Sequence, residues 1–581
     1  MCGITGIVGE NPSREVVERM TRRLTHRGPD DSGVWTAPGV CLGHTRLSIL
    51  DLSPAGHQPM SLGPITVTYN GEIYNFRELR RELAGPFVSE CDTEVLLHLY
   101  QRDGDDMVHA LRGMFALAIW DEQHRRLFAA RDRLGIKPLF YRELPGGLAF
   151  ASELKALLEL GQPSVDRTAL RDYFTYKYVP APKSIYSGIR QLPPAHTLVW
   201  DGQLHVRRYW TPSTEVTVTD EEQAVERLGS MLSEIVPKHT LADVPVGVFL
   251  SGGIDSTTVT AHLERPRTFT LGIDIKRRDE SDKARRVAEH FRTDHHEEIA
   301  AAIDLNEAVD TVPGVYDEPF GDSGAWAMYL VSRMARRQVK VALSGEGGDE
   351  FFCGYHWYSK WLTQRSTAMH RKLAMVLPPF SRRARSLQRR AATGLERYSA
   401  FLSAFTRRQK HALLTPDLLD TDYDDLWHFR CFWREELEPL KRMQWVDMHT
   451  YLPGDLLMKV DRASMAHSLE VRPPLLDHRL VEFALSVDTR LLRDVKGGRG
   501  KLIVRRLMDD RVPEGLFDLP KRGFNLPIGS WLRRDPDLLD DALERLAKAG
   551  IIRRPRRPSF THEQAWSLLV LDRWMSQVGL L

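Results

Sequence analysis

The chain has few cysteines and no long apolar run. Only five of its 581 residues are cysteines, at positions 2, 41, 91, 353 and 431, and no two of them have CxxC spacing. An odd number without that spacing argues against a disulfide framework and a structural zinc site, so we expect reduced thiols. No apolar run approaches the roughly 20 residues of a membrane span, and no secretory signal pattern opens the chain. We therefore expect a cytoplasmic protein without a membrane partner.

An excess of charge of either sign is also missing. The 80 Lys and Arg residues nearly balance the 78 Asp and Glu residues, and the net charge of +2 argues against a general nucleic-acid surface. The exception is the arginine-rich stretch 365–410, whose apolar residues have helical spacing. We favour a solvated helical face there over a docking surface for an anionic partner, because the stretch contains no recognisable nucleic-acid module. No nucleic-acid partner is predicted.

The length exceeds what one hydrophobic core usually supports, so we expect two domains. Short β-type runs such as CGITGIVG, VTYNGEIY and GMFALAIW fill the first 200 residues, with helical patterns at 14–24 and 92–101 behind the N-cap candidates Ser13 and Asp92. This predicts α+β sandwiching. A polar, turn-rich segment after Trp210 places the domain boundary near residues 205–220.

The second part alternates strands and helices. From Val244 onward, the runs VPVGVFL, TFTLGI and VKVALSG are separated by helical patterns, including one over 325–337, which predicts a parallel sheet. From about Cys353 the sequence is mostly helical, and we expect this third part to fold onto the sheet domain.

Cys2 becomes the first residue if Met1 is removed, and it then carries both a thiol and a free α-amino group. A thiol attacks a carbonyl as thiolate, and an α-amine titrates near neutrality, so such a residue contains its own proton acceptor. A Met-Cys start also occurs by chance. The residues that follow decide between these interpretations.

Several motifs follow within the first 140 residues. They are Arg46 in HTRLSIL, Asn70-Gly71-Glu72 in TYNGEIYN, Asp92 in ECDTE, and the runs HRGPDD and RDRLGIKPL. Taken singly, Asn70-Gly71 is typical of a tight turn and Asp92 of a helix N-cap. Jointly and in this order, they resemble the glutaminase domain of the N-terminal-nucleophile amidotransferases, of which the glutamine-hydrolysing asparagine synthetase family is the nearest.

The resemblance implies a role for each residue. Cys2 would attack the side-chain amide of glutamine, and the Asn70 side chain and the Gly71 N–H would hold the oxyanion. Arg46 would bind the α-carboxylate and Asp92 the α-ammonium group. The implied glutamine site as a whole comprises Arg46, Leu47, Ser48, Ile49, Asn70, Gly71, Glu72 and Asp92.

The hexapeptide SGGIDS at 251–256 lies between a predicted strand and a predicted helix. Glycines there let backbone N–H groups approach phosphate oxygens, and the helix N-terminus favours an anion. No lysine follows as in GxxxxGK(S/T), so kinase chemistry is not indicated. The hexapeptide resembles the pyrophosphate loop of ATP pyrophosphatases, but a helix-start turn with ordinary capping explains it equally well.

The run SGEGGDE at 344–350 distinguishes the two explanations. It also follows a strand, so it should lie at the same carboxyl edge of the sheet, where open α/β folds bind ligands. Together the two loops resemble the synthetase domain of the asparagine synthetase family. The resemblance assigns Asp255 and Asp349 to Mg²⁺ on the triphosphate, an ion that prefers oxygen ligands.

Further roles follow from the same resemblance. Glu346 would lie near the acceptor, and Lys501 and Lys521 would neutralise charge on the α-phosphate and the leaving pyrophosphate, with Arg462 a weaker candidate for that task. The implied ATP site comprises Leu250, Ser251, Gly252, Gly253, Asp255, Ser256, Leu271, Gly272, Ser344 and Gly345.

The resemblance covers nearly the whole chain and so implies its fold and reaction. We expect an αββα N-terminal-nucleophile hydrolase sandwich over 2–210, then over 220–581 an α/β parallel-sheet ATP-pyrophosphatase domain with a helical C-terminal part. Glutamine would be hydrolysed to glutamate and ammonia. ATP would activate a carboxylate as an adenylate, which ammonia converts to an amide with release of AMP and pyrophosphate. The family also implies an internal passage for ammonia and a homodimer.

Aspartate is the expected acceptor, but the segment between the ATP loops departs from the family pattern. Ala325-Trp326-Ala327 stands where members usually have smaller or Thr/Pro-type residues, and Ser323 where some have an arginine. An aspartate α-carboxylate needs a cation, and this segment lacks the arginine. The alternative acceptor is therefore a different carboxylic acid in a specialised biosynthetic pathway, for which Trp326 would reshape the pocket. Two further alternatives are a ring-closing synthetase and a non-catalytic regulator that binds glutamine and ATP. The intact set of reactive groups argues against both.

Overall fold

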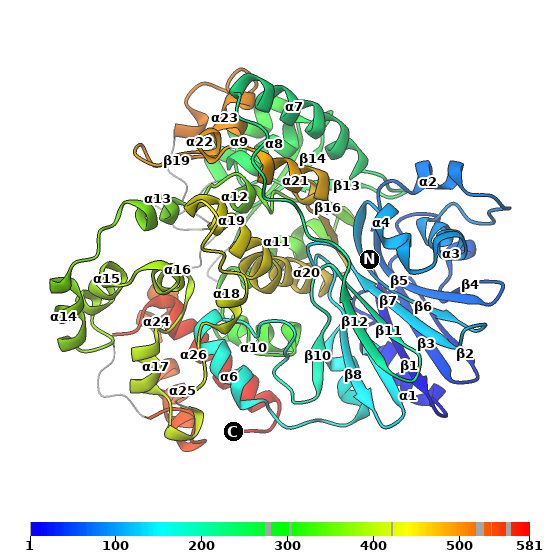
Figure 1. Cartoon of the computed structure of the whole chain (residues 1–581), viewed down its shortest axis with the longest axis horizontal. Helices are drawn as coiled ribbons and strands as arrows, with labels where there is room; N and C mark the ends of the chain where they lie inside the picture. The colour runs from blue at the N-terminus through cyan, green and yellow to red at the C-terminus, as the bar shows by residue number, and fades with distance from the viewer. Residues whose placement is uncertain are drawn as a thin grey trace.

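The structure is a computed structural model that describes residues 2–273, 281–300, 305–419, 422–518, 528–535, 537–553 and 559–581. Figure 1 shows a layered pair of sheets built from the N-terminal part of the chain, beside a smaller sheet that is surrounded by helices from the remainder. Within the described ranges, no helix has the length and apolar character needed to cross a membrane.

Two six-stranded sheets form the N-terminal part. One contains, in spatial order, β10 (Ile189–Gln191), β8 (Phe140–Leu144), β9 (Gly147–Ala151), β1 (Gly3–Gly9), β3 (Val40–Arg46) and β2 (Asp31–Ala37). The other contains β12 (Leu204–Arg208), β11 (His196–Trp200), β7 (Arg126–Arg131), β6 (Gly113–Asp121), β5 (Ile65–Ile73) and β4 (Met60–Leu62). Their facing sides share one hydrophobic cluster that includes Ile4, Leu42, Ala118 and Leu148. Alternate residues of each strand therefore fill the space between the sheets.

Helices cover both outer faces. Helix α1 (Arg14–Arg22) begins where the Ser13 side chain accepts from the Val16 N–H, and it buries Val17 and Met20 against the first sheet. Helix α3 (Asp92–Asp103) packs apolar residues against Tyr69 and Leu117 of the second sheet. The layers are thus helix, sheet, sheet and helix, which confirms the predicted αββα sandwich.

One local prediction in this domain is wrong, and one alternative interpretation is excluded. The N-cap of α3 is Cys91, and Asp92 is already in the first turn, where its carboxylate accepts from groups of the neighbouring sheet. Asn70-Gly71 is part of strand β5 and pairs with Ala116 and Phe115, so it forms no tight turn. In both cases a tertiary contact replaces the local hydrogen bond that the dipeptide or cap would otherwise make.

After a segment of irregular structure, α7 (Glu221–Lys238) begins with Asp220 as its N-cap. The sheet of the second part has the order β15 (Asp294–Ala300), β14 (Arg267–Ile273), β13 (Val246–Phe249), β16 (Val341–Leu343) and β17 (Glu470–Arg472), and its paired strands are all parallel. The predicted parallel sheet is therefore present. Its edge strands were not predicted. Strand β15 is rich in charged residues, and β17, which follows helices of the third part, is only three residues long.

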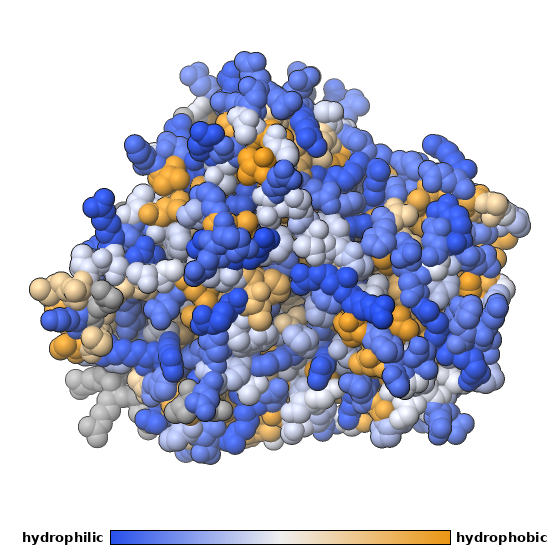
Figure 2. Space-filling model, viewed as in Figure 1, coloured by the Kyte–Doolittle hydropathy of each residue, from blue (hydrophilic) through white to orange (hydrophobic). Residues whose placement is uncertain are grey.

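The basic stretch forms helices, as expected from its apolar spacing. They are α14 (Ala368–Val376), α15 (Arg382–Ala391), α16 (Gly394–Leu402) and α17 (Arg407–Leu413). Arg382, Arg383, Arg389 and Arg390 are exposed or half-buried, which agrees with a solvated face. Figure 2 shows a largely hydrophilic surface on this side of the molecule, with apolar side chains at its left edge over α14, where Met369, Met375 and Val376 are exposed.

Candidate active sites

Cys2 lies directly before β1 and is buried, with 8% of its surface exposed. Its backbone N–H donates to Asn70 Oδ1 at 2.9 Å, and its carbonyl accepts from Arg27 Nε at 3.0 Å. The next N–H, that of Gly3, donates to Thr45 Oγ1 at 3.1 Å. The backbone around the thiol is therefore fixed by groups from three other segments of the domain.

Burial and two neighbouring groups have opposite effects on the pKa of the Cys2 thiol. Burial raises the pKa of the thiol, while the backbone N–H of Leu47 and the charge of Arg46 lower it. Both Leu47 and Arg46 belong to the predicted glutamine site, so the structure brings the sulfur, the guanidinium and the Leu47 N–H together. A thiol with a raised pKa needs a base to become a nucleophile, and the α-amine of a processed Cys2 would supply one.

Asn70 places an unused donor beside Cys2. While Oδ1 accepts the Cys2 N–H, Nδ2 is buried and has no hydrogen-bond partner. An unpaired buried donor is costly, and such groups are often retained for a ligand. At the next position, Gly71, an added Cβ would lie 2.2 Å from the Met114 carbonyl oxygen, so only glycine fits. The pair therefore has the donors and the close approach that an oxyanion hole requires.

Arg46 ends β3 and is held by its own loop. Its guanidinium donates to the carbonyls of Leu50, Asp51 and Ser53, which curls residues 47–53 around the side chain. Leu47 and Ile49 are buried within this loop, and the Ser48 N–H donates to Asp30 Oδ2 at 2.8 Å. Because the charge of Arg46 acts on the Cys2 thiol, a carboxylate bound by Arg46 would lie in the same site as Cys2.

Two buried carboxylates, Asp92 and Glu72, occupy another part of the site. Asp92 Oδ2 accepts from Tyr69 Oη at 2.8 Å and from the Ile73 N–H at 3.0 Å, and burial raises its pKa to about 6. The pKa of Glu72 is also raised, because burial and the charges of Asp92 and Glu470 outweigh the charge of Arg472. Glu72 Oε1 is buried without a hydrogen-bond partner. This pair of acids is suited to an ammonium group.

The predicted phosphate loop SGGIDS connects β13 to helix α8 (Ile254–Ala261). Gly252 adopts a left-handed φ of +69°, and Gly253 is the N-cap of the helix. The loop of residues 344–350 follows β16 and leads into α12 (Gly348–Phe351). A Cβ added to Gly345 would lie 2.9 Å from the Asp255 Cβ, so the two loops lie in contact at the carboxyl edge of the sheet, as predicted.

Lys501 joins the two loops. Its Nζ lies 2.5 Å from Asp255 Oδ2 and 2.7 Å from Asp349 Oδ1, and the side chain is 4% exposed. The residue has a left-handed φ of +61° and serves as the N-cap of helix α23 (Leu502–Met508). Lys501 therefore pairs with the two acidic residues that the sequence analysis assigned to the same ATP site. Lys521 lies outside the described residues.

The carboxylates of Asp255 and Asp349 are compatible with Mg²⁺ on a triphosphate. Because both converge on one ammonium group, both are within reach of a single cation, and both supply hard oxygen ligands. Among the described residues no group of three metal-type side chains occurs, so phosphate oxygens and water would complete the coordination. The predicted adenosine-binding positions Leu250, Leu271 and Gly272 are buried at the end of β13 and within β14.

Glu346 borders a small cavity between the two parts of the molecule. The cavity is lined from the N-terminal domain by Ile136 and Lys137 and from the ATP loop by Ser344 and Glu346. Ser344 Oγ and Glu346 Oε2 are buried without hydrogen-bond partners. Lys137 is buried, and its pKa is lowered by that burial, with Asp461 3.6 Å away. The cavity therefore connects residues near the ATP loop with the domain that contains Cys2.

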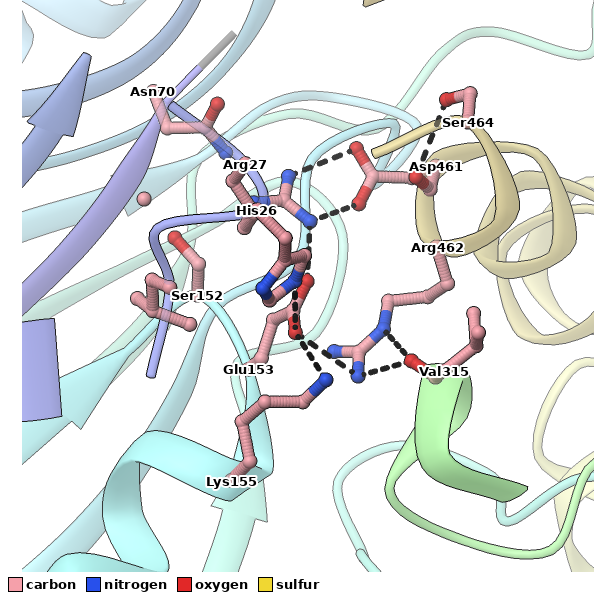
Figure 3. A network of polar contacts seen from close by, with 12 residues as sticks. His26, Arg27, Asn70, Ser152, Glu153, Lys155, Val315, Asp461, Arg462 and Ser464 are labelled. Carbon is pink, nitrogen blue, oxygen red and sulfur yellow. Dashed lines mark hydrogen bonds and ion pairs between the residues drawn. The ribbon is translucent and has the colours of Figure 1, made fainter. Parts of the chain in front are cut away.

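A buried ion cluster beside this cavity joins the two domains (Figure 3). Arg27 contacts Glu153 at 2.7 Å and Asp461 at 2.8 Å, and Arg462 contacts Glu153 at 3.2 Å and Asp317 at 2.6 Å. Arg462 is thus committed to the domain interface, which corrects its assignment as a candidate for phosphate charge. The sequence contains Arg27 in HRGPDD and Asp461 and Arg462 in VDRAS, but no pattern within either motif indicates that the two motifs would pair.

The segment between the ATP loops is in contact with a cation from another helix, which the sequence did not indicate. Lys459 of helix α20 (Met458–Met465) places Nζ 2.8 Å from Asp322 Oδ2. Although burial acts in the opposite direction, the charges of Asp322, Asp455 and Glu346 raise the pKa of Lys459. A cation therefore lies near Glu346 even though Ser323 stands where some members of the family have an arginine. Trp326 is 1% exposed and stacks on Tyr329, with ring centroids 4.9 Å apart.

Comparison with known proteins finds relatives of both parts of the chain. A family model described as asparagine synthase matches residues 227–576, and one described as a glutamine amidotransferase domain matches residues 1–210. A putative glutamine-hydrolyzing asparagine synthetase of Mycobacterium tuberculosis is 36% identical over 586 residues, which cover 92% of this chain and 88% of that protein. Glutamine-hydrolyzing asparagine synthetase 1 of Bacillus subtilis is 33% identical over 564 residues, covering 92% and 88%. Amidase chyE of Penicillium rubens is 29% identical over 614 residues, covering 91% and 89%.

Proposed function

Because the chain belongs to the asparagine synthetase family of glutamine-dependent, ATP-using amidotransferases, we propose which residues perform each half-reaction and which acid is amidated. Residues 2–210 form the glutaminase domain in this proposal, and residues 220–581 form the synthetase domain. The observation that carries it is the position of Cys2, whose N–H is bound by Asn70 while Asn70 Nδ2 stays unpaired.

In the glutaminase half, the Cys2 sulfur attacks the side-chain amide carbon of glutamine. The α-amine of processed Cys2 accepts the thiol proton and returns it to the leaving nitrogen, so the C–N bond breaks and ammonia departs. Asn70 Nδ2 and the Gly71 N–H bind the oxyanion, while Arg46 and the Asp92–Glu72 pair bind the two ends of the amino acid. Water then hydrolyses the thioester to glutamate and restores the thiol.

In the synthetase half, a carboxylate oxygen of the acceptor displaces pyrophosphate from the α-phosphate of ATP. Asp255 and Asp349 would hold Mg²⁺, which supplies charge neutralisation on the triphosphate when it is bound. Lys501 provides a further cation between the two loops, and the backbone of residues 251–253 binds the phosphates. Ammonia attacks the adenylate next to Glu346, which accepts a proton from the nitrogen as AMP leaves.

The cavity between Lys137 and Glu346 supports an internal route for ammonia. Free ammonia is mostly protonated in neutral water, and the protonated form is no nucleophile. A route through the domain interface keeps the nitrogen away from bulk water. In this proposal the cluster of Figure 3 holds the two domains in the register that the route requires.

Aspartate is the acceptor we propose. Lys459 supplies the cation that an α-carboxylate needs, and the Asp322–Asp455 pair near it supplies carboxylates for an α-ammonium group. The second candidate is another carboxylic acid, which is favoured by the bulky Trp326 and by the similarity to a protein named as an amidase. A homodimer and a cytoplasmic location are further proposals that rest on the resemblance alone, and sedimentation of the purified protein tests the first.

The proposal is tested with purified protein, glutamine and Mg-ATP and a panel of acids headed by aspartate. We expect asparagine, glutamate, AMP and pyrophosphate in equal amounts. If another acid is amidated and aspartate is not, the acceptor assignment is wrong but the proposed reaction type still holds. Glutamate release without AMP formation for any acid would contradict the synthetase assignment.

A further inference from the structure

The glutamine site is closed on one side by a strand of the other domain. Strand β17 belongs to the parallel sheet of the synthetase domain, yet its residue Arg472 donates from Nη2 to Glu72 Oε2 at 2.8 Å. Both side chains are buried, with 0% exposure for Arg472 and 3% for Glu72. The contact is therefore a buried ion pair between domains.

Arg472 is held rigidly by groups other than Glu72. Its Nε donates to Glu470 Oε1 at 2.5 Å, and Nη1 donates to the carbonyls of His239 and Leu241 at 3.0 and 2.6 Å. A planar guanidinium fixed by three further acceptors has one orientation in which it can meet a carboxylate. Glu72 therefore pairs with a guanidinium whose position is fixed by its other hydrogen bonds.

Glu72 has one oxygen left for a ligand. Oε2 is used by Arg472, whereas Oε1 is buried without a hydrogen-bond partner and lies in the site that contains Asp92. The described groups that face Glu72 are Arg472 and Glu470 from β17, Asp92 from α3, and the phenols of Tyr69 and Tyr74. Arg472 is the side-chain cation among them, and without it three neighbouring acids would compete for protons.

We propose that Arg472 is a positioning residue of the glutaminase reaction, supplied by the synthetase domain, which orients Glu72 so that Oε1 binds the α-ammonium group of glutamine. The inference rests on the proposed glutaminase function. It makes the glutamine site a composite of both domains. The same residue also accepts the Ser344 N–H at its carbonyl, at 3.0 Å, so one residue contacts the glutamine site through its side chain and the ATP loop through its backbone.

The test compares two reagents that both alkylate Cys2 in the full-length protein. The glutamine analogue 6-diazo-5-oxo-L-norleucine carries an α-ammonium group, and iodoacetamide does not. In Arg472→Met we expect inactivation by the analogue to slow by about 10- to 100-fold, the range for loss of a hydrogen bond to a charged group, while iodoacetamide labels Cys2 at the wild-type rate. The KM for glutamine rises by a similar factor, and ammonia-dependent amide synthesis continues.

The pH profile supplies a readout that a merely structural role would not move. Removing the cation raises the pKa of Glu72 further, and a protonated Glu72 binds ammonium poorly. The acid limb of kcat/KM for glutamine therefore shifts to higher pH in Arg472→Met and returns toward the wild-type position in Arg472→Lys, which restores a charge. Arg479→Met is the matched control, because Arg479 follows on the same segment but pairs with Asp477 and Glu234 nearer the surface.

Two outcomes would overturn the proposal. Equal slowing with both alkylating reagents would show that the substitution disturbs the Cys2 region as a whole. Unchanged analogue inactivation and an unchanged acid limb would show that Glu72 does not depend on Arg472. Failure of the underlying function looks different, because a wild-type protein without glutaminase activity would release no glutamate at all.

Discussion

The Cys2 N–H donates to Asn70 Oδ1 at 2.9 Å, so the amide of Asn70 is oriented by the residue whose chemistry it is proposed to assist. With Oδ1 occupied, Nδ2 faces the buried site without a partner. We predict that Asn70→Ala lowers kcat for glutamine hydrolysis by about 10²- to 10³-fold, the usual effect of losing an oxyanion donor. Glutamate release measures it. The half-buried Asn306→Ala, in the other domain, serves as control, and a loss below about threefold in Asn70→Ala would remove Asn70 from the oxyanion hole.

Lys501 between Asp255 and Asp349 gives a prediction for the other half-reaction. Lys501→Met should abolish acceptor-dependent pyrophosphate formation, because two largely buried carboxylates and the phosphates would then face one another without this cation. Glutamine hydrolysis should persist. Lys496→Met, at an exposed position of the preceding loop, is the matched control. Pyrophosphate release at the wild-type rate in Lys501→Met would refute the role.

The ion cluster of Figure 3 gives a prediction about stability. Replacing Arg27 by Met leaves Glu153 and Asp461 buried with less compensating charge, and breaking a buried pair in this way costs about 3–5 kcal/mol. The midpoint of urea unfolding should fall accordingly. Arg14→Met, which removes an exposed pair with Glu18, should change the free energy of unfolding by less than about 1 kcal/mol. Equal midpoints for both variants would show that the cluster contributes little.

The raised pKa of Asp92 predicts a pH dependence for glutamine binding. Burial raises the pKa of Asp92 to about 6, and the carboxyl must be ionised to bind an ammonium group. As the pH falls through about 6, Asp92 gains a proton and the KM for glutamine should rise, while above that pH it should level off. The KM for ATP, measured over the same range, is the control. A glutamine KM that stays constant from one pH unit below that value to two above it would contradict the assignment.

The acceptor pocket yields a prediction in which two variants are compared. Lys459→Ala should raise the KM for aspartate by at least about tenfold, since a charge-assisted contact is lost, and leave glutamine hydrolysis intact. Trp326→Ala tests whether the indole shapes the pocket. Efficient aspartate amidation by the wild type that Trp326→Ala leaves unchanged would refute a role for Trp326 in acceptor choice, and its buried stacking on Tyr329 would then explain its presence.

The sequence predicted those parts of the molecule that a local pattern encodes. Alternating apolar runs indicated the two sheets, and the glycine-containing loops after β13 and β16 indicated one shared edge, where Gly345 and Asp255 now lie in contact. The roles of Cys2 and Asn70 came from a family resemblance, and the hydrogen bond between them is consistent with those roles without testing them.

Contacts between distant segments could not be predicted in this way. Asp92 is typical of an N-cap in its local sequence, but its carboxylate accepts from Tyr69 and Ile73 of the neighbouring sheet. Arg472 and Glu72 belong to different domains, and β17 is too short to show a strand pattern. Lys459 was missed because a cation was sought beside Ser323 in the sequence, whereas the fold brings one from another helix.

Nitrogen released at Cys2 is proposed to reach the acceptor inside the protein. Glutamine labelled with ¹⁵N in its side-chain amide, supplied with Mg-ATP, the acceptor and a large excess of unlabelled ammonium, tests this claim most directly through the mass of the amide product. We predict a product that carries mostly ¹⁵N in the wild type and none in Cys2→Ala. A wild-type product whose label matches the isotope ratio of the bulk solution would contradict the proposed internal transfer.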